Sequence, residues 1–275
     1  YEYPATNPSQ YMTDTISSLL TFEDTIEGRA HDLPYLSACS FVLFGVLAIA
    51  ARMSLPESMA KVAYVVPSTV HAVVIAGVSV WTMINCPGLN IMGELWQMIQ
   101  GGGDASVDFV SGHSRVLFYG VAFSNGYFAV DTILMFINNE ATILFLIHHI
   151  LGAFFFSVSV ILACCEVYVA YLLATELSTP FLNLALYSKE GSGMNLLGNV
   201  LFAMMFFLVR VFPIPIYLYS LYQSLDFFAS NELSSLLKYC SITTICIPPI
   251  LNAVWSLEII KKATEFLCPP KEKSS

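Results

Sequence analysis

Six side chains that can carry charge or transfer protons lie within otherwise apolar stretches of this 275-residue chain. An ionised side chain at the centre of a bilayer costs about 2.5–3.5 kcal/mol on insertion scales, so such residues usually face a bundle interior and a partner. Their types suit acid–base chemistry, ion pairing or recognition of a lipid headgroup. The candidates are His71, Asp131, His148, His149, Glu176 and Arg210.

Depth along the predicted helices decides which of these side chains can meet. With about 1.5 Å of rise per residue, His71, Asp131 and His148 lie at similar depths. Glu176 and Arg210 lie deeper, close to the middle of their helices. The sequence therefore allows Asp131 to pair with His148 or His71. It also predicts that Glu176 pairs with Arg210.

The adjacent histidines His148 and His149 point about 100° apart if they lie on a helix. We therefore predict that one faces inward while the other orients its neighbour or packs. Adjacent histidines are poor metal ligands on a helix, where a spacing of i, i+4 is preferred. The sequence contains no other set with metal-ligand spacing and predicts no metal and no cofactor. Two interpretations of the six residues stay open: structural pairs that fix helix register, or a ligand-binding site.

Long apolar segments must position these residues. Apolar residues make up 56% of the chain and charged residues 11%, whereas soluble domains carry about 25% charged residues. A membrane helix needs about 20 mostly apolar residues. We predict an all-α, polytopic transmembrane helix bundle of about seven spans, with six or eight as alternatives. The spans are 34–51, 62–84, 115–137, 141–163, 166–187, 197–219 and 239–261.

Prolines interrupt three of the predicted spans. Proline at membrane depth frees backbone carbonyls that the bundle or water must satisfy. The interruptions indicate either kinks around an internal cavity or ordinary packing irregularity. We predict that the Glu176–Arg210 pair supports a kink at Pro180. The residues are Pro180, Pro213, Pro215, Pro248 and Pro249.

Basic residues predict the orientation, because cytoplasmic loops are enriched in Lys and Arg. With the N-terminus outside and the C-terminus in the cytosol, the cytosolic segments contain Arg52, Lys61, Lys189, Lys261, Lys262, Lys271 and Lys273. The opposite side keeps Arg29, Arg115 and Lys238. The net charge of −9 and the lack of a basic stripe outside the last residues exclude a nucleic-acid partner.

Several segments resemble the TLC-domain family, which contains ceramide synthases, translocation-associated membrane proteins and lipid-regulating relatives. Residues 124–131 (SNGYFAVD), 145–152 (FLIHHILG) and 175–183 (TELSTPFLN) are similar to three of its helical motifs. Residues 206–210 (FFLVR) and 252–255 (NAVW) continue in the expected order, and His71 resembles an early histidine of the family. The resemblance covers about residues 35–262.

We consider three functions, of which the resemblance implies the first two and the polar N-terminal arm suggests the third. Ceramide synthases have a pair of aspartates after their histidine pair, whereas residues 176–180 (ELSTP) contain none. The chain therefore resembles the branch that is not ceramide synthase, which implies a protein that binds or regulates membrane lipids without catalysis. An acyl-CoA-dependent N-acyltransferase is one alternative, with His148 or His149 as general base and Asp131 or Glu176 as acidic partner. An accessory structural subunit of a membrane complex is the other.

Three regions follow from this reading: a polar, acidic N-terminal arm (1–33), a TLC-type membrane domain (34–262) and a basic tail (263–275). Expected partners are membrane lipids and, through the arm, other proteins. The tail ends in residues 271–275 (KEKSS), which resembles a dilysine retrieval signal and predicts the endoplasmic reticulum. A mitochondrial or plastid membrane is the alternative, because a transit segment before Tyr1 is compatible with the sequence.

Overall fold

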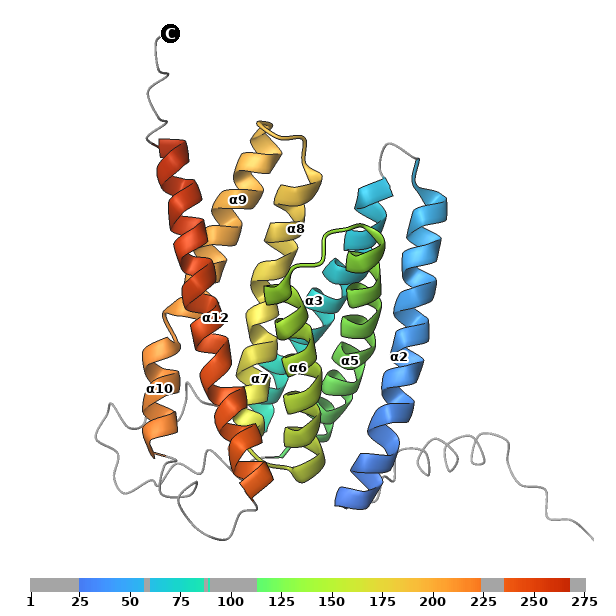
Figure 1. Cartoon of the computed structure of the whole chain (residues 1–275), viewed down its shortest axis with the longest axis vertical. Helices are drawn as coiled ribbons and strands as arrows, with labels where there is room; N and C mark the ends of the chain where they lie inside the picture. Colours follow the sequence, from blue (N-terminus) through green and yellow to red (C-terminus); the bar gives the residue numbers. More distant parts are fainter. Residues whose placement is uncertain (1–24, 57–59, 87–88, 90–112, 224–234, 268–275) are drawn as a thin grey trace, which may run out of the picture.

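The computed structural model describes residues 25–56, 60–86, 89, 113–223 and 235–267. Within these residues the chain forms seven helical rods without β-strands, and successive rods cross the molecule in alternating directions (Figure 1). The predicted all-α bundle is confirmed. Five rods are single helices: α2 (Ile26–Ser54), α3 (Ala60–Asn85), α5 (Arg115–Ile137), α6 (Ile143–Leu162) and α12 (Ser235–Leu267). The other two rods each contain two helices: α7 (Glu166–Ala174) with α8 (Thr179–Tyr187), and α9 (Gly193–Phe206) with α10 (Ile214–Gln223).

Six of the rods are long and apolar enough to cross a membrane. They are Ile26–Ser54, Ala63–Asn85, Arg115–Ile137, Ile143–Leu162, Glu166–Tyr187 and Gly193–Tyr219. The seventh predicted span, 239–261, lies inside α12, which is not among the six. At 33 residues, α12 is about 50 Å long, and it packs against α6 and α7 in the same bundle. It therefore belongs structurally with the six candidate spans.

The first rod begins earlier than hydropathy predicts. Helix α2 starts at Ile26, eight residues before the predicted 34. The Thr25 hydroxyl caps it by accepting a hydrogen bond from the Gly28 amide at 3.0 Å. Arg29 is buried and donates from Nε to the Ile161 carbonyl at 2.8 Å. Residues 26–33 of the predicted arm are thus part of α2, while 1–24 lie outside the described residues.

Small residues set the close crossing of α2 and α5. A Cβ atom on Gly126 would lie 2.4 Å from the Phe41 amide nitrogen, a distance that real side chains do not tolerate. The Ser40 hydroxyl bridges the same crossing by donating to the Phe123 carbonyl at 2.7 Å. Glycine at residue 126 therefore allows two backbones to approach closely, as is common between membrane helices.

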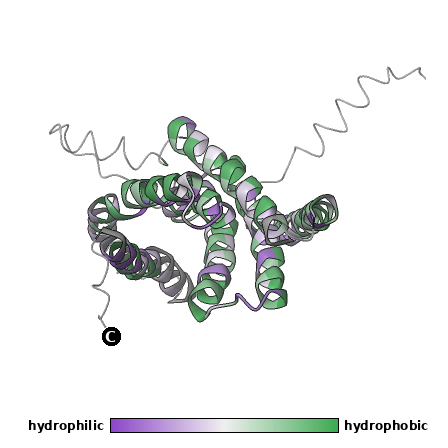
Figure 2. Cartoon of the chain, turned by 90° about the horizontal axis from the view of Figure 1, so that it is seen from above, coloured by the Kyte–Doolittle hydropathy of each residue, from purple (hydrophilic) through white to green (hydrophobic). Residues whose placement is uncertain are grey.

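Hydrophobic residues predominate along most of the helices (Figure 2), and many large apolar side chains are exposed. Large apolar side chains that point outward include Leu43, Val46 and Met53 of α2, which are more than half exposed. In a bilayer these side chains contact lipid, so their exposure fits membrane helices.

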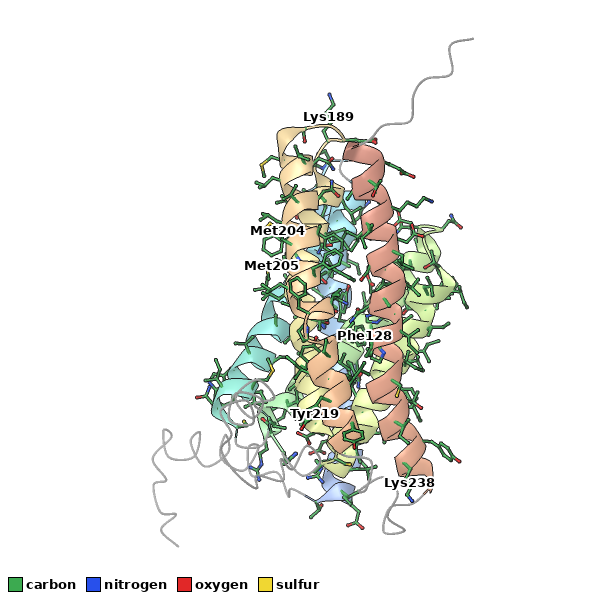
Figure 3. The ribbon with its side chains drawn as sticks, turned by 90° about the vertical axis from the view of Figure 1, so that its left-hand side faces the viewer. Phe128, Lys189, Met204, Met205, Tyr219 and Lys238 are labelled. Carbon is green, nitrogen blue, oxygen red and sulfur yellow. The ribbon has the colours of Figure 1, made fainter. Side chains whose placement is uncertain are left out.

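Charged residues mark the two ends of the bundle. Lys189 and Lys238 lie at opposite ends, with Phe128 between them (Figure 3). Arg52 shares the end of Lys189, because helices α2 and α8 both finish there (Figure 1). The orientation with the N-terminus outside and the C-terminus in the cytosol stays a prediction based on basic residues.

Candidate functional site

Two irregular helical turns and helix α12 line one cavity. The segment Thr175–Ser178 (η2) forms a 3₁₀ turn before Pro180, and Phe207–Val211 (η3) forms a π-helical turn before Pro213. In η3 the Phe212 amide bonds to the Phe207 carbonyl, five residues back, at 2.9 Å. Helix α12 continues through Pro248 and Pro249. Pro248 itself lines the cavity, and the turns before Pro180 and Pro213 contribute Thr175, Glu176 and Arg210 to its wall. A kink at these prolines stays a prediction.

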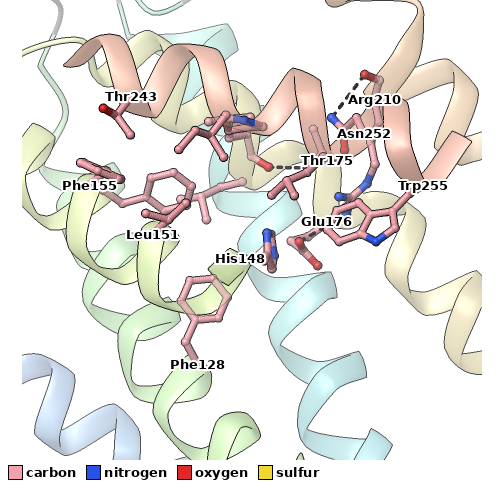
Figure 4. A pocket seen from close by; sticks show the side chains of 17 residues that line it. Phe128, His148, Leu151, Phe155, Thr175, Glu176, Arg210, Thr243, Asn252 and Trp255 are labelled. Atoms are coloured by element: carbon pink, nitrogen blue, oxygen red, sulfur yellow. Dashed lines mark hydrogen bonds and ion pairs between the residues drawn. The ribbon is translucent and has the colours of Figure 1, made fainter. Parts of the chain in front are cut away.

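The cavity has about 50 Å³ of space for the centres of water molecules. A single water needs roughly 10–15 Å³ by this measure, so the space holds several waters or part of a ligand. Figure 4 shows the side chains that line it from α5, α6, α7, η2, η3 and α12. Its polar lining consists of His148, Thr175, Glu176, Arg210, Thr243, Asn252 and Trp255.

An ion pair forms one wall of this cavity. Arg210 Nη2 lies 3.4 Å from Glu176 Oε1, and both side chains are largely buried. Arg210 also donates from Nε to the Ser178 hydroxyl at 3.0 Å. The Thr179 hydroxyl donates to the other carboxylate oxygen of Glu176 at 2.6 Å. The predicted Glu176–Arg210 pair is confirmed, and it joins the 3₁₀ turn before Pro180 to the π turn of η3.

His148 projects into the cavity from α6. Its ring contacts the ring of Trp255 on α12 edge to face, with centroids 5.6 Å apart. Its ring also contacts Phe128 of α5 at 6.1 Å and the neighbouring His149 at 5.6 Å. A ring nitrogen in this position can donate a hydrogen bond to a ligand or accept one from it.

His149 points away from the cavity toward α5. Its Nε2 lies 3.4 Å from Asp131 Oδ2, and its Nδ1 lies 3.1 Å from the Thr132 hydroxyl. That hydroxyl donates to the Phe128 carbonyl, so it accepts from His149 Nδ1. The contact between His149 and Asp131 then needs a proton on one of the two facing atoms. The prediction that one histidine faces inward while its neighbour packs is confirmed.

The partner of Asp131 differs from both pairings that depth allowed, although it is one of the combinations named for the acyltransferase alternative. We predicted His148 or His71, because depth alone was considered, and the structure places His149 beside the carboxylate. His71 instead contacts the Ser124 hydroxyl through Nε2 at 3.0 Å and stacks on Tyr127 at 4.0 Å between centroids. His71 Nδ1 is buried without a hydrogen-bond partner among the described residues. Helix rotation, not depth, decides these contacts.

Three of the six predicted residues, His148, Glu176 and Arg210, line the cavity. The other three, His71, Asp131 and His149, do not line it. The Phe128 ring stacks on His149 at 5.1 Å, and the His148 and His149 rings contact each other at 5.6 Å. The structure therefore places only half of the predicted set where a ligand in the cavity could contact it.

The sequence reasoning missed a third polar cluster at the end of the bundle where α7 begins. Glu166 is fully buried; its carboxylate lies 2.5 Å from His113 Nδ1 and accepts from the Ser114 amide at 2.9 Å. These residues are more than 50 positions apart, and no local pattern in the sequence pairs them.

Ser178 and Trp255 were also missed as site residues, although both lie in segments that supported the family resemblance. Metal binding finds no support in the described ranges, where no group of three or more His, Cys, Asp or Glu side chains could hold an ion.

The fold and the site define the class of this molecule: a polytopic bundle of membrane helices with a mostly apolar cavity whose wall contains an ion pair. The family model of the TLC domain, which bears the names TRAM, LAG1 and CLN8, matches residues 62–261, more than two thirds of the chain. The chain therefore belongs to the TLC-domain family and is an integral membrane protein. No curated protein and no solved structure matches it.

Proposed function

We propose that this TLC-domain protein binds a membrane lipid in the cavity between α6, α7, η3 and α12 and acts without catalysis. The supporting observation is the amphipathic lining of the cavity. Apolar side chains such as Leu151, Phe155 and Ile247 cover much of its wall, and the Glu176–Arg210 pair occupies one end. Sites of this kind bind small amphiphiles, because the apolar wall supplies affinity and a few polar groups fix orientation.

The test is mass spectrometry of the lipids that copurify with the chain. Leu151→Trp fills the cavity, and Phe154→Trp adds the same side chain on the exposed side of α6 as a matched control. We expect one lipid class to copurify in a fixed ratio with the wild type and with Phe154→Trp, and to be depleted from Leu151→Trp. Equal lipid content in all three proteins would argue that the cavity is not the binding site.

One observation favours acyl transfer as a second candidate. His148 lines the cavity together with Glu176, and a general base must reach the reacting group. Asp131 does not assist His148 directly, since it contacts His149. Purified protein in nanodiscs, supplied with a sphingoid base and acyl-CoA, tests this function. Product that disappears on His148→Ala supports the enzyme, and its absence with every donor supports the non-catalytic protein.

The accessory-subunit alternative and the cellular address depend on residues outside the described ranges. Residues 1–24 of the predicted arm and 268–275 of the tail belong to this part of the chain. A protein partner bound through the arm therefore stays a prediction, which a native gel tests: migration only as a monomer or dimer opposes it. Residence in the endoplasmic reticulum, and membership in the branch that is not ceramide synthase, also stay predictions.

A further inference from the structure

The ionised groups that line the cavity cancel one another. Glu176 and Arg210 supply one negative and one positive charge, and their side chains are 12% and 9% exposed. Asp131, a further carboxylate in this half of the bundle, does not line the cavity and contacts His149. A ligand with a net charge would leave one charge uncompensated in a desolvated site, which is strongly unfavourable.

Polarity changes along the length of the cavity. Trp255 and His148 contact each other at one end, and Glu176 lies beside them (Figure 4). Along α6 the wall continues through Leu151 to Phe155, seven residues or about 10 Å beyond His148. The charged groups therefore lie at one end of the lining and mostly apolar side chains at the other, where Thr243 lies near Phe155 but donates its hydroxyl proton to the Tyr239 carbonyl (Figure 4). This division suits an amphiphile with one polar group and one chain.

The polar end offers both hydrogen-bond donors and acceptors. A guanidinium has five N–H donors, of which Nε and Nη2 of Arg210 are directed at Ser178 and Glu176. The indole N–H of Trp255 is a further donor, and the Glu176 carboxylate is an acceptor. A hydroxyl or amide group can satisfy both kinds of partner without bringing a charge.

From these three features we infer that the cavity takes an uncharged lipid whose polar group both donates and accepts hydrogen bonds, such as a long-chain alcohol, a fatty amide or a monoacylglycerol. The inference rests on the proposed lipid-binding function and specifies its ligand class. It separates this ligand from phospholipids with a net charge, from ionised fatty acids and from long-chain amines. The Glu176–Arg210 pair is then the residue pair that determines specificity.

The experiment compares three probes of equal chain length: a monoacylglycerol, an alkyl sulfate and an alkyl trimethylammonium, the last two permanently charged. Displacement of the copurified lipid from the full chain is followed by native mass spectrometry. We expect the wild type to bind the monoacylglycerol at least about tenfold more tightly than either charged probe, a difference of about 1.4 kcal/mol. Tighter binding of a charged probe would overturn the inference.

Charge variants sharpen the test. Glu176→Gln gives the cavity a net positive charge and should shift the preference to the alkyl sulfate. Arg210→Gln gives it a net negative charge and should shift the preference to the alkyl trimethylammonium. The double variant is neutral again and should keep the preference for the monoacylglycerol. If either single variant fails to fold, the double variant still tests whether the net charge of the cavity sets the preference. A preference of the double variant for a charged probe would refute the charge argument.

Failure of the proposed function gives a different pattern. If no probe displaces a bound lipid, and Leu151→Trp retains as much lipid as the wild type, then the cavity is not a lipid site and the inference falls with it. If Leu151→Trp loses lipid but a charged probe binds best, the proposed function stands and only the ligand class is wrong.

Discussion

Replacing Arg210 by leucine should destabilise the bundle more than replacing Arg210 and Glu176 together. In the single variant the Glu176 carboxylate stays largely buried, while its cationic partner at 3.4 Å is gone. The Thr179 hydroxyl, at 2.6 Å, still donates to it but brings no positive charge. Leaving one member of a buried ion pair unmatched costs about 3–5 kcal/mol, whereas replacing both with apolar residues is often nearly neutral.

The expected magnitude can be refined from the contacts that are lost. Arg210→Leu also removes the bond to the Ser178 hydroxyl at 3.0 Å, and hydrogen bonds to charged groups contribute about 1.5–3 kcal/mol. The double variant loses this bond too, and it also loses the bond between Thr179 and Glu176. The difference between the two variants therefore reports the unmatched carboxylate, less the contribution of that second bond. We expect that difference to be about 0.5–3 kcal/mol, the range of coupling energies for contacting residues.

The assay is unfolding in mixed micelles with a rising fraction of denaturing detergent, followed by far-ultraviolet circular dichroism. Leu208→Ala is the matched control, because Leu208 belongs to the same π turn but points outward and is more than half exposed. It should unfold close to the wild type. The reasoning is refuted if the single and double variants unfold at the same detergent fraction, since Glu176 and Arg210 would then be energetically independent.

Three further predictions address packing, the second polar cluster and location. Gly126→Ala should destabilise by about 1–3 kcal/mol through overpacking against α2, whereas Gly45→Ala, where a Cβ meets open space, should unfold like the wild type. Glu166→Gln weakens the contact with His113 and should lower the stability by about 1.5–3 kcal/mol in the same assay. Unchanged stability would show that this contact does not stabilise the bundle. Changing Lys271 and Lys273 to Ser in a tagged chain should release it from the endoplasmic reticulum by microscopy; residence in a mitochondrial or plastid membrane would exclude the retrieval signal.

Hydropathy was sufficient to predict the helical bundle, because a membrane helix must satisfy its backbone internally and must be apolar over its length. It was less reliable at the first helix. Residues 26–33 are polar, and α2 begins there because Thr25 caps it and because Arg29 finds a carbonyl on α6. Both reasons depend on particular contacts, and the second joins residues 132 positions apart, which no window along the sequence can detect.

Depth also predicted the Glu176–Arg210 pair correctly, because both residues lie near the middle of their rods and have opposite charge. It failed for Asp131, because His148 and His149 differ little in depth and differ mainly in direction. Direction is set by packing: a Cβ on Gly152 would approach the Phe128 ring to 3.2 Å, so the α6 face with Gly152 lies against α5. His149 shares the α5 side with Gly152 and contacts Asp131. A single sequence does not specify this rotation.

His148 and its neighbour His149 lie in different surroundings, although their ring centroids are 5.6 Å apart. His149, Asp131 and Thr132 contact one another within the protein, so these contacts can stabilise the rotation of α6 against α5 without a ligand. His148 and the Glu176–Arg210 pair line the cavity. Buried polar groups are costly unless they are hydrogen-bonded, and water or a ligand in the cavity can bond to the His148 ring. The proposed lipid would therefore contact His148, Glu176 and Arg210, while the contacts of His149 help to hold α6 in the rotation that presents His148 to the cavity.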